Sequence, residues 1–200
     1  MNVSYALPIA CLCGYLLGSL PVAVWVARWR GVDIFTVGTR NPGAANVFRN
    51  VGPPWGALVW LGDMGKGAAA VGIGLSLGLR PEVALAGGLA AIVGHWHSLF
   101  LGFRGGAGLA TLIGVTVMAA PWPGMLAFAI GALLVAVWRN TGWASALSYA
   151  AYIALAMSLG QGYALPWAIV GLAVIVTARA RVVERRGKRD VVTSAHALPP

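Results

Sequence analysis

A long stretch without charge dominates this sequence: no formally charged residue lies between Arg104 and Arg139. The whole chain follows the same trend, with 59% hydrophobic residues, only 10% charged residues and a mean hydropathy of +0.80. Soluble domains carry about 25% charged residues. A surface this poor in charge must face lipid, so the composition predicts an all-α integral membrane protein. It excludes a soluble enzyme, a disordered chain and a soluble nucleic-acid-binding protein.

Seven apolar runs predict seven helices, some of them short. A helix needs about 20 apolar residues to cross a bilayer, and we expect Pro8 and Pro21 to kink the first run. The segment 121–124 divides the charge-free stretch into two pieces, which form either one kinked helix or a hairpin of two short helices. The runs are Ser4–Ala27, Trp55–Leu79, Val83–Leu101, Leu109–Ala120, Met125–Trp138, Gly142–Gly160 and Tyr163–Ala178.

The distribution of arginine decides between the kinked helix and the hairpin. Cytoplasmic loops of membrane proteins are enriched in lysine and arginine, and the loop 28–53 holds four arginines. With this loop inside the cell, a hairpin keeps Arg139 and the basic tail inside as well and leaves only Arg80 outside. One kinked helix would place the tail outside. We therefore predict seven transmembrane helices with the N-terminus out and the C-terminus in.

We expect one membrane domain over residues 1–190 and a disordered tail over residues 191–200. The formal net charge of +9 comes from basic residues between apolar runs and in the tail 179–190. Membrane orientation and lipid headgroups explain it better than nucleic acid does. Cys11 and Cys13 lie in an apolar run, and His95 and His97 would not share a helix face. We therefore expect neither a disulfide framework nor a metal site.

Two glycine-rich polar loops fall on the predicted cytoplasmic face. The first, residues 38–46, ends three residues before Arg49. Its glycines let backbone N–H groups converge into an anion-binding nest. Asn41 is a candidate cap for a helix that begins at Pro42. Arg40 and Arg49 are candidate phosphate ligands. The alternative is an ordinary loop with arginines at lipid headgroups.

The second loop, Arg104-Gly105-Gly106-Ala107-Gly108, directly precedes the helix predicted from Leu109. Free N–H groups and the helix dipole make such a junction an anion site, and Thr111 can add a hydroxyl. A flexible turn is the alternative.

Three further polar residues fall within apolar runs. Asp63 and Lys66 are three residues apart, so a helix places them on one face. Ionisable groups in a membrane span are costly and often functional, although a structural ion pair has the same spacing. His95 is either part of a site or a buried structural histidine, and Ser19 alone carries no information.

Taken together, these segments resemble the bacterial acyl-phosphate-dependent glycerol-3-phosphate acyltransferases (the PlsY family). The resemblance covers about the first 115 residues through motifs and the remainder through hydropathy. Each piece alone is weak, but their common order and spacing are specific. The motifs are Gly18-Ser19-Leu20-Pro21, the loop 38–46 with Arg49, Asp63-Met64-Gly65-Lys66-Gly67, and Gly94-His95 followed by Arg104–Thr111.

The resemblance implies an inner-membrane enzyme of phospholipid synthesis with an active site open to the cytoplasm. It would move an acyl group from acyl phosphate to the 1-hydroxyl of glycerol 3-phosphate, giving lysophosphatidic acid, without a metal or other cofactor. His95, Thr39 and Asn41 are the catalytic candidates, with His95 as the best candidate general base. The candidate substrate-binding residues are Ser19, Asn46, Arg49, Lys66, Arg104, Gly105, Gly106 and Gly108.

Several positions depart from the family pattern. Ala107 stands where a lysine is usual, and Ala180 and Val183 stand where a histidine and an asparagine are usual. Arg40 replaces a glycine, and Phe35 replaces an arginine. A second hypothesis therefore stays open, a catalytically impaired relative that binds lipid phosphates or a partner. A small transporter, the third hypothesis, would need ionisable residues on several spans and an internal repeat.

Overall fold

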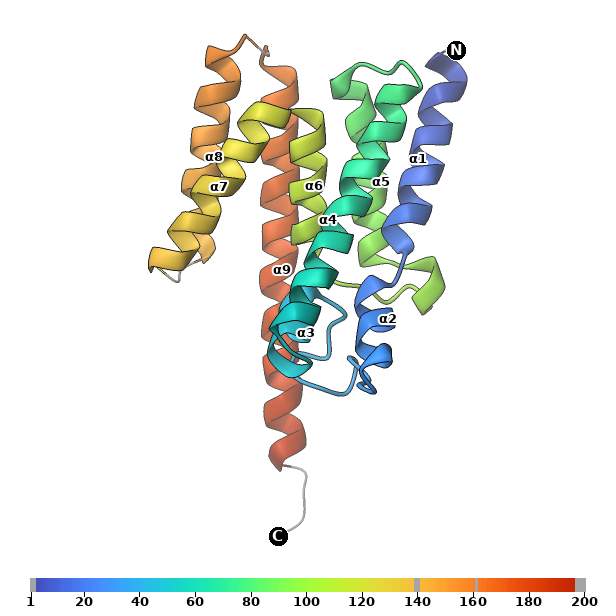
Figure 1. Cartoon of the computed structure of the whole chain (residues 1–200), viewed down its shortest axis with the longest axis vertical. Helices are drawn as coiled ribbons and strands as arrows, with labels where there is room; N and C mark the ends of the chain where they lie inside the picture. The colour runs from blue at the N-terminus through green and yellow to red at the C-terminus, as the bar shows by residue number, and fades with distance from the viewer. Residues whose placement is uncertain (1–2, 139–140, 161, 197–200) are drawn as a thin grey trace.

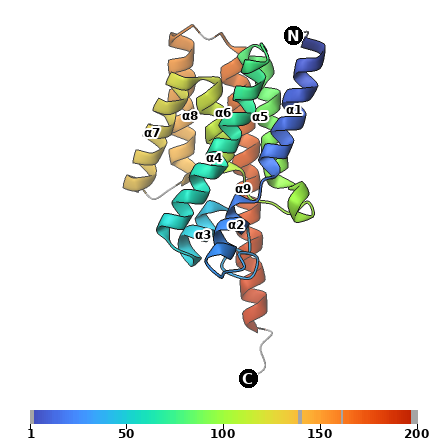
Figure 2. The same ribbon diagram turned by 45° about the vertical axis from the view of Figure 1, so that its right-hand side comes forward.

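The computed structural model describes residues 3–138, 141–160 and 162–196, which form helices and connecting loops without a named β-strand. The helices pack as a bundle with the two chain termini at opposite ends (Figures 1 and 2). They are α1 (Val3–Ser19), α2 (Val22–Trp29), α3 (Ala44–Asn50), α4 (Pro53–Ser76), α5 (Pro81–Trp96), α6 (Leu109–Ala119), α7 (Pro121–Trp138), α8 (Thr141–Ser158) and α9 (Ala164–His196), with a short 3₁₀ helix at Leu99–Leu101.

The charge-free stretch folds as two helices, as the arginine distribution predicted. Helix α6 rises from the end of the bundle near the C-terminus, and α7 returns toward it (Figure 1). The predicted start of the second helix at Met125 is wrong, because α7 begins at Pro121. Proline is accepted in the first turn of a helix, where its missing N–H has no partner to lose.

Proline has a stronger effect in the first apolar run. The run does not form one kinked helix but breaks into α1 and α2 at Leu20 and Pro21. Pro21 has no N–H to continue the helical ladder, and the N–H of Leu20 turns back to the carbonyl of Leu17 at 3.1 Å. Pro8, by contrast, remains inside α1.

The third run also ends earlier than predicted. Helix α5 stops at Trp96 rather than Leu101, and the chain turns back on itself. The N–H of Phe103 donates to the carbonyl of Ser98 at 2.8 Å, and Gly102 adopts the left-handed conformation that this turn requires. The turn brings the second glycine loop beneath the end of α5.

Small residues set the spacing of the central helices. A Cβ added to Gly18 of α1 would clash with the backbone of Ala91 on α5, and one added to Gly114 of α6 would clash with the carbonyl of Met64 on α4. Such close backbone approach is typical of helix packing in membranes. The helices that carry Ser19, Lys66 and His95 are therefore held tightly together.

The exterior of the bundle is apolar. Large hydrophobic side chains are exposed on several helices, such as Leu12, Leu61 and Val174. By length and apolar composition, two described helical segments reach the size of a membrane span, namely Ser4–Trp29 and Ala164–Val183. Three shorter apolar helices accompany them, at Leu109–Ala119, Pro121–Leu134 and Leu147–Ser158.

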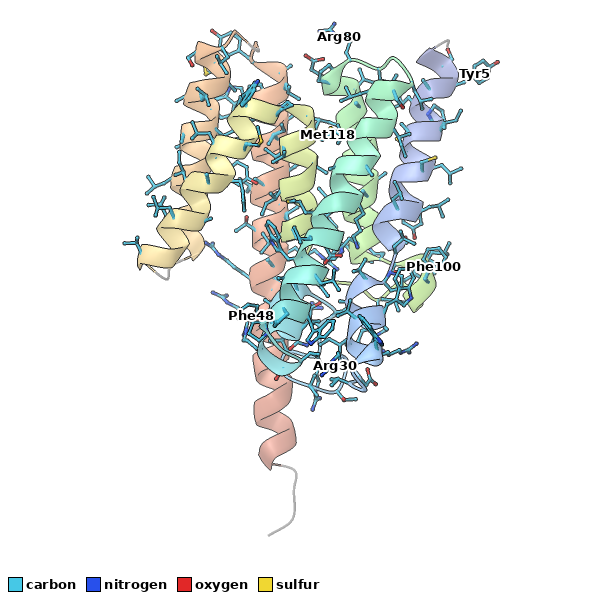
Figure 3. The ribbon with its side chains drawn as sticks, viewed as in Figure 1. Tyr5, Arg30, Phe48, Arg80, Phe100 and Met118 are labelled. Atoms are coloured by element: carbon cyan, nitrogen blue, oxygen red, sulfur yellow. The ribbon has the colours of Figure 1, made fainter. Side chains whose placement is uncertain are left out.

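The two ends of the bundle differ in what they carry. Helices α2 and α3 and both glycine loops lie at the end from which α9 projects, here called the C-terminal end (Figures 1 and 2). Figure 3 places Arg30 and Phe48 at this end and Arg80 and Tyr5 at the other. Helix α9 continues past residue 190 to His196, and residues 197–200 of the predicted tail lie outside the described residues.

Candidate active site

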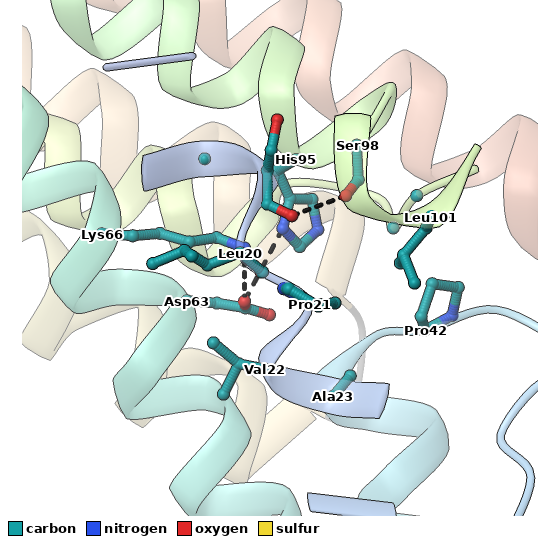
Figure 4. A pocket seen from close by; sticks show the side chains of 14 residues that line it. Leu20, Pro21, Val22, Ala23, Pro42, Asp63, Lys66, His95, Ser98 and Leu101 are labelled. Atoms are coloured by element: carbon teal, nitrogen blue, oxygen red, sulfur yellow. Dashed lines mark hydrogen bonds and ion pairs between the residues drawn. The ribbon is translucent and has the colours of Figure 1, made fainter. Parts of the chain in front are cut away.

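A pocket lies where the break between α1 and α2 meets α4, the end of α5 and both glycine loops. Its polar lining comes from Ser19, Asp63, Lys66, His95 and Ser98 (Figure 4). Pro42 of the first loop closes another side. Gly105 and Gly106 of the second loop complete the lining.

A buried carboxylate organises the centre of the pocket. Oδ1 of Asp63 lies 2.9 Å from Nζ of Lys66 and 3.6 Å from Nδ1 of His95 (Figure 4). Nζ of Lys66 also donates to the carbonyl of Leu20 at 3.2 Å, at the break before α2. The three side chains are almost fully buried, so solvent screens their interactions little. The helical spacing predicted that Asp63 and Lys66 would share a face, and the ion pair confirms it.

Two serines fix the end of α1 against the end of α5. Oγ of Ser98 donates to the carbonyl of Ser19 at 2.5 Å, and Oγ of Ser19 donates to the carbonyl of Gly94 at 3.5 Å. Both side chains are buried. Ser98 is not among the residues predicted from the sequence, and no local pattern identifies it, because its partner lies 79 residues away along the chain.

The second glycine loop is pressed against His95 and Trp96. The N–H of Gly106 donates to the carbonyl of His95 at 3.0 Å, and Nε1 of Trp96 donates to the carbonyl of Ala107 at 2.9 Å. A Cβ on Gly106 would clash with Nε2 of His95 and lie 3.0 Å from the carbonyl oxygen of Pro42. The two glycine loops thus meet beside the histidine. Helix α6 begins at Leu109 as predicted, after Gly108 in the left-handed conformation.

Asn46 holds the first loop in shape. Its Nδ2 donates to the carbonyls of Ile34, Val37 and Asn41 at 3.1–3.2 Å, and its Oδ1 accepts from the N–H of Thr39 at 3.1 Å. Asn46 is buried. Its carboxamide is therefore engaged with the loop itself, which favours a loop-shaping role over direct substrate contact.

The predicted cap at Asn41 is wrong, because α3 begins at Ala44 with Gly43 as its N-cap. The carbonyl of Asn41 accepts from Nδ2 of Asn46 and from the N–H of Gly43, so the chain turns here instead of entering a helix. Oδ1 of Asn41 is buried and has no hydrogen-bond partner among the described residues. Arg40 adopts a left-handed backbone (φ 53°), the conformation that the usual glycine would favour.

The structure does not bring every predicted residue into the pocket. Ser19, Lys66, His95, Gly105 and Gly106 line it, whereas Thr39, Asn41, Asn46, Arg49, Arg104 and Gly108 do not. The guanidinium of Arg104 lies 4.0 Å from the ring centroid of Phe35, and Arg49 is exposed at the end of α3. These arginines stand around the loops at the C-terminal end.

A second, larger cavity of about 430 Å³ opens beyond the second loop. It lies among α4, α6, α7, α8 and α9, and its wall is mainly apolar. The residues that line it include Trp60, Leu109, Leu112, Ala127 and Phe128. Leu109 directly follows the glycine loop, so one chain segment borders both the polar pocket and the apolar cavity.

Both the sequence and the fold are similar to those of known proteins. A family model described as glycerol-3-phosphate acyltransferase matches residues 8–186. The chain belongs to the glycerol-3-phosphate acyltransferase family. A family member from Synechococcus sp. (strain JA-3-3Ab) is 41% identical over 180 residues, which cover 88% of each chain. Glycerol-3-phosphate acyltransferase 1 from Deinococcus radiodurans is 40% identical over 151 residues, 76% of this chain and 75% of that protein.

Solved structures of the acyltransferase family agree. The fold is similar to the crystal structure of PlsY, an integral membrane glycerol 3-phosphate acyltransferase, in its glycerol 3-phosphate form. The TM-score is 0.74 at 28% identity, over 94% of this chain and 92% of that one. The lysophosphatidic acid form of PlsY gives a TM-score of 0.71 with the same coverage. The family membership expected from the motifs is confirmed.

Proposed function

We propose that this protein transfers an acyl group from acyl phosphate to the 1-hydroxyl of glycerol 3-phosphate at the buried Asp63–Lys66–His95 pocket. The products are lysophosphatidic acid and inorganic phosphate. One observation carries the proposal: motifs spread over nearly 90 residues, from Gly18 to Gly106, converge on one pocket with a buried cation and a histidine. Members of the family are named for this acyl transfer to glycerol 3-phosphate.

We assign His95 as the general base. The carboxylate of Asp63 faces Nδ1, which favours the tautomer that carries its proton there and leaves Nε2 free to accept one. Nε2 faces Gly106 of the second loop. As the hydroxyl oxygen attacks the acyl carbonyl carbon, its proton passes to Nε2. The carbon–oxygen bond to phosphate then breaks, and phosphate leaves with the electron pair.

Positive charge and backbone dipoles stabilise the negative charge of this reaction. Lys66 contributes a buried ammonium, and the glycine loop ends at the N-terminus of α6. Asn41 precedes the pocket residue Pro42, and its Oδ1, which has no partner among the described residues, accepts a hydrogen bond from a glycerol hydroxyl. The exposed guanidinium of Arg49 at the end of α3 attracts the anionic substrate toward the pocket, and the hydroxyl of Thr39 on the first loop can donate a hydrogen bond to it.

The acyl chain occupies the apolar cavity beside α6. Leu109 directly follows the glycine loop, and Leu112 lies about one turn farther along α6. Both line this cavity, so a chain attached to a carbonyl at the loop extends directly into it. Burial of methylene groups there contributes about 0.8 kcal/mol for each group. This binding energy holds the reacting carbonyl in place.

We place the bundle in a bacterial inner membrane with seven crossings, formed by α1 with α2, α4, α5, α6, α7, α8 and α9. The C-terminal end faces the cytoplasm, because α2, α3 and the basic part of α9 project there and Arg80 lies at the opposite end. The pocket then opens toward the compartment that holds soluble glycerol 3-phosphate, and the apolar exterior contacts membrane lipids.

An acyl-transfer assay on purified variants tests the proposal. The protein in liposomes receives acyl phosphate and radiolabelled glycerol 3-phosphate. We expect lysophosphatidic acid from the wild type and from Arg80→Ala, whose exposed arginine lies far from the pocket, and at least a 100-fold lower rate from Lys66→Ala. Equal rates in Lys66→Ala and Arg80→Ala would contradict the assignment of the site.

A further inference from the structure

Helix α9 brings an arginine to Trp96, the last residue of α5. Nη2 of Arg179 donates to the carbonyl of Trp96 at 3.4 Å, and its guanidinium carbon lies 4.9 Å from the centroid of the Trp96 ring. Nε of Arg179 is buried and has no hydrogen-bond partner among the described residues. A planar guanidinium has five N–H donors, so this side chain is held in place with donors to spare.

Trp96 connects this arginine to the loop. Its carbonyl oxygen would lie only 2.5 Å from a Cβ on Gly105, and its indole N–H donates to the carbonyl of Ala107. Arg179 therefore packs on the one residue that contacts the loop at both points. Gly105 lines the candidate active site.

The one cation of the second loop, Arg104, does not line the pocket. Ala107 has no charge, and neither does Ala180 or Val183 on α9. The guanidinium of Arg104 stacks on the ring of Phe35 instead. Arg179 is a cation that packs on Trp96, and Trp96 in turn contacts the second loop.

We propose that Arg179 binds the phosphate group of a bound substrate at the second glycine loop and supplies the positive charge that Ala107 lacks. The inference rests on the proposed function. Guanidinium and phosphate match in geometry and form charge-assisted hydrogen bonds. The phosphate belongs either to acyl phosphate or to glycerol 3-phosphate, and the kinetics described next separate the two.

The first test compares Arg179→Ala with Arg185→Ala, which removes an exposed arginine farther along the same helix. Loss of a charge-assisted contact predicts a KM about 10- to 100-fold higher for one substrate. The affected substrate identifies the phosphate. We expect unchanged kinetics in Arg185→Ala. Inorganic phosphate, a product, should also inhibit Arg179→Ala more weakly.

A second variant separates charge from structure. If Arg179 only braces Trp96, a lysine at position 107 does not replace it. If Arg179 supplies charge, kcat/KM of the double variant Arg179→Ala/Ala107→Lys is at least tenfold higher than that of Arg179→Ala. Arg179→Lys then keeps part of the wild-type kcat/KM. If the wild type is active and Arg179→Ala changes neither KM nor inhibition by inorganic phosphate, this inference is overturned and the proposed function still stands. No wild-type activity would overturn the proposed function first.

Discussion

Asp63 and Lys66 form an ion pair of 2.9 Å on successive turns of α4, with each side chain only 4% exposed. Breaking a buried pair by removing one partner leaves an uncompensated charge and costs about 3–5 kcal/mol. We therefore expect Asp63→Asn to lower the thermal unfolding temperature in detergent markedly. Asp63→Ala/Lys66→Met removes both charges and should unfold closer to the wild type. An additive loss in the double variant would contradict a paired interaction.

Close approach at Gly106 predicts an effect specific to catalysis. A Cβ at this position would clash with Nε2 of His95 and press on Pro42. We expect Gly106→Ala to lower the acyl-transfer rate by at least tenfold. Gly65→Ala is the matched control, since nothing lies within 4 Å of its Cβ and it sits on the exposed face of α4. That control should keep its activity and gain up to about 1 kcal/mol of stability.

The network around Asn46 predicts that its loss loosens the first loop. Asn46→Ala removes the donors to three carbonyls and the acceptor for Thr39. Buried groups left without partners cost about 1–3 kcal/mol each. We expect faster proteolysis within residues 34–46 and a higher KM for glycerol 3-phosphate. Asn50→Ala removes one donor to Oδ1 of Asn46 from the end of α3 and should have a smaller effect. Equal effects would argue against Asn46 as the residue that organises the loop.

The apolar cavity predicts a chain-length effect. Ala127 lines it with a side chain only 6% exposed. A larger residue in Ala127→Phe fills space that we assign to the acyl chain. The rate with long-chain acyl phosphates should fall, while the rate with short-chain donors stays near that of the wild type. A uniform fall for all chain lengths would instead indicate general misfolding.

The positions of most helices are predictable from the sequence because local patterns determine them. The charge-free stretch and the arginines predicted the α6–α7 hairpin, and the three-residue spacing predicted the Asp63–Lys66 pair. The ends of helices are less predictable. Helix α5 stops at Trp96 because the following turn folds back. Helix α3 starts at Ala44 because Nδ2 of Asn46 donates to the carbonyl of Asn41.

The contacts that complete the site join residues far apart in sequence. Ser98 meets Ser19 across 79 positions, and Arg179 meets Trp96 across 83. No periodicity in a single sequence encodes such pairs. The orientation of His95 toward Asp63 likewise depends on how α4 and α5 pack against each other. Contacts between glycines and the neighbouring helix set this packing, and the sequence alone does not show which residues meet.

Measuring both products of the wild-type reaction at once tests directly whether this protein transfers an acyl group from acyl phosphate to glycerol 3-phosphate. Purified protein in liposomes is given acyl phosphate and glycerol 3-phosphate, and lysophosphatidic acid and inorganic phosphate are quantified in the same samples. We expect equal amounts of the two products, formed only when both substrates are present. Phosphate release without lysophosphatidic acid, or no turnover by the folded protein, would contradict it.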